Sequence, residues 1–583
     1  MDEDRWPPEW AAMGFLCYNS PYRDFVKAQV TELLDYDIDG FHFDMLWFGH
    51  TGQVCYCKHC RSLFEARYHI EMPTSASWDA RWRKFLDFRY ESNTRFCDDI
   101  TAFVRSKRPD LSVMYNYHGT PPNSWQEGML PVKHRLSSDY GTGEGYPMRF
   151  GHHYASLMSC FLSNLQPGTP WQGVTSRYTR ALNDKTVRPL ADLTWETLTY
   201  VAHGGMPLFV DTPEDDGLTL DRVAYERIGH VFSEVASKRR YVGHEPIRQV
   251  GLYFSAKTRD WYGKQDAQRY LAAFTGAHRV LVESHIPVGC VFDENVTLER
   301  LREYPLIYLA NVAILSQLER DLITQYVREG GRVIATGDTS RFDEDGGESQ
   351  EFGLAGLFGM HFVGKCETRT NFFSAPESLS SGIGLERSVY VPGPNNIVEA
   401  HEASAYGSLK IAAHDRGPGT EVGHAPYNSP SKTVGPALTR RRFGRGEALY
   451  VPFSPETAYI SSSSLPEQRV FANNVISSAL PEQRIVVSAP LNVEAVITRD
   501  RAHDRTYFVH FIGFVGVRDG QSQAASQILA PVMEEMWRYR AEVRMPQSIR
   551  RANAHSGDTM VRVDGTTVLV ETGEIHDVIA ITL

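Results

Sequence analysis

Apolar residues in the first 240 positions alternate between helical and strand-like spacing. Residues 22–35 and 79–106 repeat apolar side chains every three or four positions, which predicts amphipathic helices. Short apolar runs with polar residues at their ends predict strands, at 38–43, 111–118, 134–140, 168–176 and 206–211. Alternating helices and strands of this kind predict a (β/α)8-type barrel over residues 1–243. Because only five strand runs are found and a closed barrel has eight strands, we expect the barrel to be incomplete at its N-terminus.

The pattern changes after residue 243. Near-continuous apolar runs at 287–292, 306–310 and 332–337 are typical of parallel strands buried on both faces, and residues 315–329 predict a crossover helix. We therefore predict a doubly wound α/β domain over residues 244–485. It contains a long excursion rich in glycine, serine and proline. Short alternating runs over residues 486–583 predict a small antiparallel β domain.

The overall composition narrows the class of protein. The 583 residues include 60 basic and 71 acidic side chains, for a net charge of −11, and 42% of the residues are hydrophobic. An acidic chain does not favour nucleic acid as a partner. No apolar run approaches the roughly 20 residues of a membrane span, and Met1-Asp2-Glu3-Asp4 does not resemble a signal peptide. We expect a cytoplasmic enzyme without a membrane or nucleic-acid partner.

One carboxylate stands out at the end of a predicted strand. Asp44 follows the run at 38–43, and the C-terminal ends of barrel strands carry the active site. Trp47 lies three residues further on and could form an aromatic platform for a sugar. His42 alternates with two phenylalanines and could point into the same site. Asp44 is therefore our first catalytic candidate.

A carboxylate beside an aromatic platform is common in sugar-binding sites, so glycoside hydrolysis is one reaction to consider. That reaction requires a second carboxyl group on the other side of the scissile bond. Glu144, in the glycine-rich segment Gly141-Thr-Gly-Glu144-Gly, is the preferred second group, and Asp139 just before it is the main rival. Glu127 and Asp211 are weaker alternatives. Three further residues at strand ends are candidates for binding hydroxyl groups: His118, Arg177 and, in a second role, Asp211.

Three of the eight cysteines fall within six residues, as Cys55-Tyr-Cys57-Lys-His-Cys60. Thiols clustered in this way suggest a metal rather than disulfides, and Zn²⁺ prefers four ligands in a tetrahedron. Cys17, just before the first predicted helix, is the candidate fourth ligand. Such a site is closed and would be structural. The chain lacks a phosphate-binding loop and a dinucleotide fingerprint, so we predict no organic cofactor.

The order of domains and the cysteine pattern resemble the β-galactosidases of glycoside hydrolase family 42. In that family a flavodoxin-like middle domain mediates trimerisation, and a similar set of cysteines holds zinc. The segments Asn19-Ser-Pro-Tyr-Arg-Asp24 and Asp39-Gly-Phe-His-Phe-Asp44, together with the cysteine run, are more similar to the hypothetical glycosyl hydrolases that include the α-L-fucosidases of family 151. Members of this group carry the first three barrel strands ahead of the segment that matches Asn19, which agrees with the strand count.

The resemblance implies a retaining exo-glycosidase of α-L-fucosidase type in which Asp44 is the nucleophile. It gives no motif for the acid/base residue, so Glu144 and Asp139 both stay open. It also implies a carbohydrate substrate, a structural zinc ion and a homo-oligomer, either a trimer or a dimer. A β-galactosidase-like specificity and a truncated homologue without activity remain the alternatives.

Overall fold

The computed structural model describes residues 16–44, 46, 48, 55–117, 119–179, 186–214, 217–414, 428–461, 465–515 and 533–583. The chain divides into two compact units. The first comprises Met1–Gly243 and Phe514–Met536, and the second comprises His244–Gly513 and Trp537–Leu583. Both units combine helices with β-sheets, so the fold is mixed α/β.

Five parallel strands run through the first unit in chain order. They are β1 (Gly40–Phe43), β2 (Ser112–Tyr115), β3 (Gly141–Glu144), β4 (Trp171–Ser176) and β5 (Met206–Val210). β1 pairs with β2, and β4 lies between β3 and β5. Over the described residues these strands form two open sheets, and the ring of a closed barrel is not seen there.

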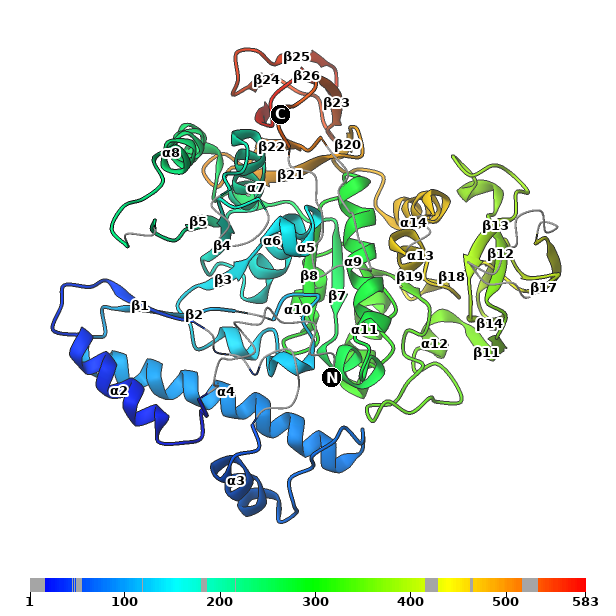
Figure 1. Cartoon of the computed structure of the whole chain (residues 1–583). Coiled ribbons are helices and arrows are strands. Elements are labelled where there is room, and N and C mark those ends of the chain that lie inside the picture. Colours follow the sequence, from blue (N-terminus) through cyan, green and yellow to red (C-terminus); the bar gives the residue numbers. More distant parts are fainter. Residues whose placement is uncertain are drawn as a thin grey trace. The chain divides into compact units, whose positions relative to one another are not determined.

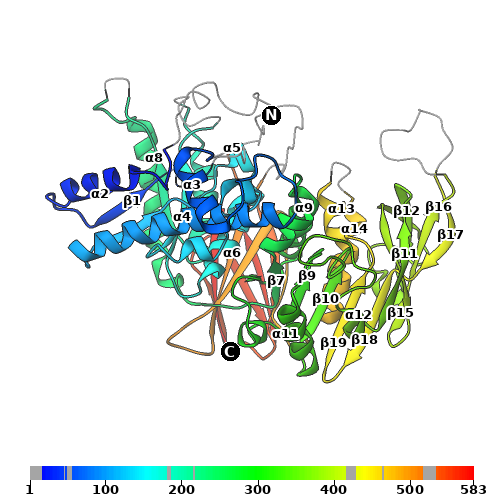
Figure 2. The ribbon, with the colours of Figure 1, turned by 90° about the horizontal axis from the view of Figure 1, so that it is seen from below.

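Two helices cover the β1–β2 pair, as Figures 1 and 2 show for the blue part of the chain. They are α2 (Tyr22–Leu33) and α4 (Ala80–Lys107), which correspond to the two predicted helices. The Asp79 carboxylate starts α4 by accepting hydrogen bonds from the first free amides of the helix. Buried apolar residues of both helices and both strands form one core, which includes Val30, Phe41, Phe96, Ile100 and Val113. This core fixes the base from which Asp44 and Asn116 extend.

The strand predicted at 134–140 is wrong. Residues Lys133–Arg135 form a short 3-10 helix (η3), and the strand β3 begins only at Gly141. Hydrophobic spacing could not identify β3, because three of the five residues 141–145 are glycines. Gly143 allows the chain to lie against α6 (His153–Leu165), and Gly145 allows it to lie against α7 (Leu190–Ala202). Glu144 is consequently the last residue of a strand and not part of a loop.

The second unit contains a seven-stranded sheet. Five of its strands are parallel, in the order β8 (Val288–Phe292), β7 (Val250–Phe254), β9 (Leu306–Leu309), β10 (Arg332–Thr336) and β19 (Gly446–Val451). Two antiparallel strands, β18 (Leu438–Phe443) and β15 (Ser404–Tyr406), extend the sheet beyond β19.

The crossover helices of this sheet are α9 (Gln268–Glu283), between β7 and β8, and α11 (Gln317–Arg328), between β9 and β10. The two crossovers extend the sheet in opposite directions, and parallel crossovers are right-handed, so α9 and α11 cover opposite faces (Figure 2). α11 begins with a capping box between Ser316 and Glu319. It corresponds to the helix predicted at 315–329.

The predicted excursion forms further sheets in the second unit. One contains β11 (Met360–Cys366) and β14 (Asn395–Ala400); the other contains β12 (Thr370–Ser374), β13 (Val389–Pro392), β16 (Ser408–Ala412) and β17 (Pro430–Gly435).

The C-terminal part of the chain is antiparallel, as predicted. One sheet has the order β20 (Val486–Ser488), β23 (Tyr539–Arg544), β26 (Thr567–Thr572) and β25 (Met560–Asp564). The other has the order β24 (Arg551–Ala554), β27 (His576–Thr582), β22 (Thr506–Gly513), β21 (Val493–Arg499) and β6 (Glu245–Pro246). Within the described part of the chain, no helix is long and apolar enough to cross a membrane.

Candidate active site and metal centre

Two of the predicted carboxylates meet at one amide. Asp44 follows β1, Asn116 follows β2 and Glu144 ends β3. The side-chain nitrogen of Asn116 donates to Asp44 Oδ1 at 2.7 Å and to Glu144 Oε1 at 2.8 Å. Because the distances of 2.7 and 2.8 Å meet at one nitrogen, the two carboxylate oxygens lie at most 5.5 Å apart.

Backbone hydrogen bonds hold the three residues in place. The backbone N–H of Asn116 donates to the carbonyl oxygen of Phe43, the residue before Asp44, at 2.8 Å. The backbone N–H of Gly145, the residue after Glu144, donates to the carbonyl oxygen of Val174 at 2.8 Å. Each side chain therefore projects from the end of a parallel strand. The hydrogen-bonded backbone of a strand restricts the position of such a side chain more than a loop does.

Tyr146 is buried beside Asp44 and Glu144. Its side chain is 4% exposed. Burial, followed by the charges of Glu144 and Asp44 and a hydrogen bond to Glu144, raises the pKa of Tyr146 well above its usual range. The phenol therefore stays protonated and acts as a hydrogen-bond donor to Glu144.

A buried polar network lies behind Glu144. Arg188 donates to Glu196 at 2.6 Å and to Asp192 at 2.7 Å, and Tyr200 donates to the other oxygen of Glu196. Although burial raises the pKa of a carboxyl group, Arg188 and His152 hold the pKa of Asp192 well below its usual range. Arg188 is paired with both Asp192 and Glu196, and these paired buried charges fix the Tyr200 hydroxyl against which Gly145 packs.

Gly145 is the tightest point between Glu144 and this network. A Cβ at position 145 would lie 2.0 Å from the Tyr200 hydroxyl oxygen. We expect Gly145→Ala to lower the free energy of unfolding by about 1–3 kcal/mol, because overpacking forces backbone or network to move, and to lower turnover by displacing Glu144. Thermal unfolding and steady-state kinetics measure the two effects.

Gly229 provides the matched control for that experiment. It lies in α8 (Arg222–Ser237), and a Cβ there has open space around it. Gly229→Ala should be neutral or stabilise the protein by up to about 1 kcal/mol, since alanine is the better helix former. Equal stability of the two variants would contradict the close packing of Gly145.

The other predicted site residues have different surroundings. Asp139 forms an ion pair with Arg105 at 2.5 Å and accepts a hydrogen bond from the Val113 amide at 2.7 Å. It therefore joins β2 to the segment before β3, whereas the Asn116 side-chain nitrogen donates to Asp44 and Glu144. The Glu127 side chain is buried in the short 3-10 helix η2 (Trp125–Glu127).

Arg177 and Asp211 contact each other at the ends of β4 and β5. Arg177 Nε donates to Asp211 Oδ1 at 2.7 Å, and its Nη1 donates to Asp221 at 2.6 Å. His42 is exposed and, by strand alternation, shares the face of β1 from which Asp44 follows. Trp47 and His118 lie outside the described residues.

Sequence reasoning did not single out Asn116. An asparagine between two tyrosines carries no motif of its own, and only the pairing of β1 with β2 places it beside Asp44. Its place near the end of the run predicted at 111–118 was the one available signal.

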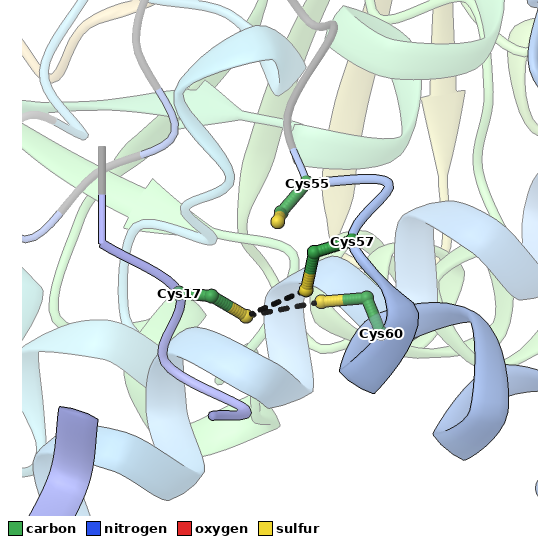
Figure 3. Close-up of side chains that lie close together, drawn as sticks. All are labelled: Cys17, Cys55, Cys57 and Cys60. Atoms are coloured by element: carbon green, nitrogen blue, oxygen red, sulfur yellow. Dashed lines mark hydrogen bonds between the residues drawn. The ribbon is translucent and has the colours of Figure 1, made fainter. Parts of the chain in front are cut away.

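The four predicted metal ligands come together. Cys17 Sγ lies 3.4 Å from both Cys57 Sγ and Cys60 Sγ, and all four sulfurs, including that of Cys55, lie within 4.8 Å of one another. Figure 3 shows the four side chains converging from two segments of the chain. Tetrahedral zinc with bonds of about 2.3 Å would separate the sulfurs by about 3.8 Å, so the arrangement fits such an ion.

Neighbouring donors complete this cluster. The Asn19 amide donates to Cys17 Sγ, and its side-chain nitrogen donates to Cys60 Sγ, both at 3.4 Å, and to Ser92 Oγ of α4 at 2.9 Å. Hydrogen bonds from Cys17 and Cys60 lower the pKa of Cys55, and the hydrogen bonds within the cluster raise the pKa of Cys17 and Cys60. Donors aimed at sulfur support ligands that carry negative charge. The cluster could therefore hold a metal ion, in a position that ties the segment before α2 to α4.

Solved structures with a similar fold are glycosidases. Alpha-L-fucosidase isoenzyme 2 from Paenibacillus thiaminolyticus matches with a TM-score of 0.77 and 19% identity, over 99% of this chain and 83% of that chain. The beta-galactosidase from Bacillus circulans sp. alkalophilus matches with a TM-score of 0.71 and 14% identity, over 98% of this chain and 84% of that chain. This chain has the fold of these glycosidases.

A third match agrees with the first two. A catalytic mutant of Gan42B, a GH42 beta-galactosidase from G. stearothermophilus, has a TM-score of 0.70 and 13% identity, over 97% of this chain and 82% of that chain. No protein-family model and no curated protein sequence matches the chain. The likeness is therefore one of fold, over nearly the whole chain.

Proposed function

We propose that the protein is a retaining exo-glycosidase of α-L-fucosidase type. Asp44 attacks the anomeric carbon, while Glu144 gives its proton to the leaving oxygen as the glycosidic bond breaks. In the second step Glu144 removes a proton from water, and the resulting hydroxide displaces Asp44 from the sugar. Each step conserves charge, and no cofactor takes part.

The observation that carries this proposal is the separation of the two carboxylates. Retaining glycosidases place them about 5–5.5 Å apart, and inverting enzymes place them about 6.5–9.5 Å apart to leave room for a water molecule. The upper limit of 5.5 Å between Asp44 Oδ1 and Glu144 Oε1 supports a retaining enzyme. Arg177 and Asp211, at the ends of β4 and β5, are the proposed contacts for sugar hydroxyl groups, together with His42, Trp47 and His118.

The choice of sugar follows the fucosidase among the structural matches, and β-galactoside is the second candidate because two matches are β-galactosidases. A panel of 4-nitrophenyl glycosides tests both. We expect the highest kcat/KM with the α-L-fucoside; preference for the β-D-galactoside would move the proposal to the second candidate. No turnover of any glycoside by a folded protein would favour the homologue without activity.

The rest of the architecture is proposed on the same basis. The five parallel strands of the first unit would belong to a (β/α)8-type barrel, residues 244–485 would form a flavodoxin-like domain that mediates a trimer or dimer, and residues 486–583 would form the C-terminal β domain. Light scattering after gel filtration measures the oligomeric state. Four free thiols at one site fit a reducing compartment, so the cytoplasm is the proposed location.

Zinc is the proposed occupant of the cysteine cluster. Cys17, Cys55, Cys57 and Cys60 would hold it, and four thiolates leave no open position for substrate, so its contribution would be structural. The ion would neutralise thiolates that otherwise repel one another.

We expect elemental analysis to find about one equivalent of zinc per chain, and Cys60→Ser to lower both zinc content and thermal stability because it removes the most buried ligand. Cys97→Ser is the matched control, since Cys97 is also buried but lies outside the cluster. It should leave the zinc content unchanged. Less than about half an equivalent of zinc in the unaltered protein would count against the site.

A further inference from the structure

Asn116 makes an unusual set of contacts. Its amide nitrogen has two N–H bonds, and both are used, one on each carboxylate of the proposed pair. The reversed orientation of the amide would place its oxygen against the Asp44 carboxylate, which is ionised as the proposed nucleophile, so that two acceptors would face each other without a donor. The orientation is thus fixed by the chemistry of its neighbours.

The oxygen of the Asn116 side-chain amide differs from its nitrogen in having no hydrogen-bond partner in the described structure. Asn116 is 4% exposed, and its Oδ1 atom is buried without a hydrogen-bond partner in the described structure. A buried acceptor without a partner lowers the stability of the folded protein. The side chain is therefore not optimised for stability, and its hydrogen bonds all serve Asp44 and Glu144.

The two hydrogen bonds from Asn116 also limit the distance between Asp44 Oδ1 and Glu144 Oε1. If the N–H bonds of the amide diverge by about 120°, the bonded carboxylate oxygens lie about 4.8 Å apart, and they cannot exceed 5.5 Å while both bonds persist. Asp44 is exposed at the strand end, where a side chain has room for other rotamers, and the hydrogen bond from Asn116 holds its Oδ1 atom toward Glu144.

We propose that Asn116 is a positioning residue that holds the nucleophile and the acid/base at the spacing required for retention. It acts through the two carboxylates and does not itself contact the sugar, because both its donors are engaged and its acceptor is covered. This inference rests on the proposed function and adds a residue to its machinery. It predicts a loss of kcat without a loss of substrate affinity.

The test is kinetic coupling between positions 116 and 144, measured with 2,4-dinitrophenyl α-L-fucoside, whose leaving group departs without protonation. Asn116→Ala should lower kcat by about 100-fold in the wild-type background and change KM by less than about 2-fold. In the Glu144→Ala background the same change should lower kcat by less than about 10-fold, because one of the two partners is already absent. Asn116→Ser, which keeps one donor, should be intermediate.

Equal losses in both backgrounds would overturn the proposal, since they indicate a general structural effect. A rise in KM with kcat unchanged would also overturn it, because it indicates direct contact with substrate. If Asn116→Ala fails to fold, the Asn116→Ser variant, paired with Glu144→Ala, decides by the same comparison. Absence of turnover in the wild type would refute the proposed function, whereas turnover without coupling refutes only the role of Asn116.

Discussion

Asp44→Asn should reduce kcat on 4-nitrophenyl α-L-fucoside by at least about 10³-fold, because an amide oxygen is a poor nucleophile and cannot form the glycosyl ester. The effect is expected to be the largest of any single substitution in the chain. The variant keeps the size of the side chain at an exposed strand end, so we expect it to fold with the stability of the unaltered protein. Steady-state kinetics and thermal unfolding measure the two properties.

Asp39→Asn is the matched control. Asp39 is also exposed and lies just before the other end of the same strand, β1. Its replacement should leave kcat unchanged. A further check uses Asp44→Gly with azide, which occupies the space of the missing carboxylate and should restore turnover with β-L-fucosyl azide as product. Normal activity of Asp44→Asn would refute the assignment of the nucleophile.

Glu144→Ala is expected to have the second-largest effect, and its size should depend on the leaving group. With 4-methylumbelliferyl α-L-fucoside, whose leaving oxygen needs a proton, we expect a loss of about 10²–10⁴-fold in kcat/KM. With 2,4-dinitrophenyl α-L-fucoside, kcat/KM should fall by about 10-fold or less, because the first step no longer needs the acid. Rapid-mixing experiments should then show a burst, since the second step still lacks its base.

The same two substrates distinguish Glu144 from its rivals. Asp139→Asn and Glu127→Gln should show losses that do not depend on the leaving group, because Asp139 is paired with Arg105 and Glu127 is buried in a 3-10 helix. A leaving-group dependence that appears in Asp139→Asn and is absent in Glu144→Ala would transfer the role of acid/base to Asp139.

The spacing of apolar residues was sufficient to predict a helix or strand where one face of that element is buried. The helices α2 and α4 and the strand β1 carry regular apolar positions, and those positions form the core beneath Asp44. The cysteine cluster was predictable for a different reason, because the spacing of Cys55, Cys57 and Cys60 already brings three ligands together and only Cys17 had to be found.

The spacing of apolar residues did not predict a strand where close packing depends on glycine. β3 is short and glycine-rich. Met158 and Leu162, which face Gly143, and Tyr200, which faces the following Gly145, lie up to 55 positions away in the sequence, so no local pattern reveals the strand. Asn116 was missed for a related reason. Its role follows from the order of three parallel strands, which brings three separate chain positions to one point, and a single sequence does not encode that order in adjacent residues.

The stereochemistry of hydrolysis tests the central claim most directly, because retention or inversion follows from the spacing of Asp44 and Glu144. Proton NMR of the first minutes of hydrolysis of 4-nitrophenyl α-L-fucoside resolves the anomeric signals before mutarotation mixes them. With Asp44 Oδ1 and Glu144 Oε1 at most 5.5 Å apart, we expect α-L-fucose to appear first. Initial formation of β-L-fucose would show inversion and contradict the account.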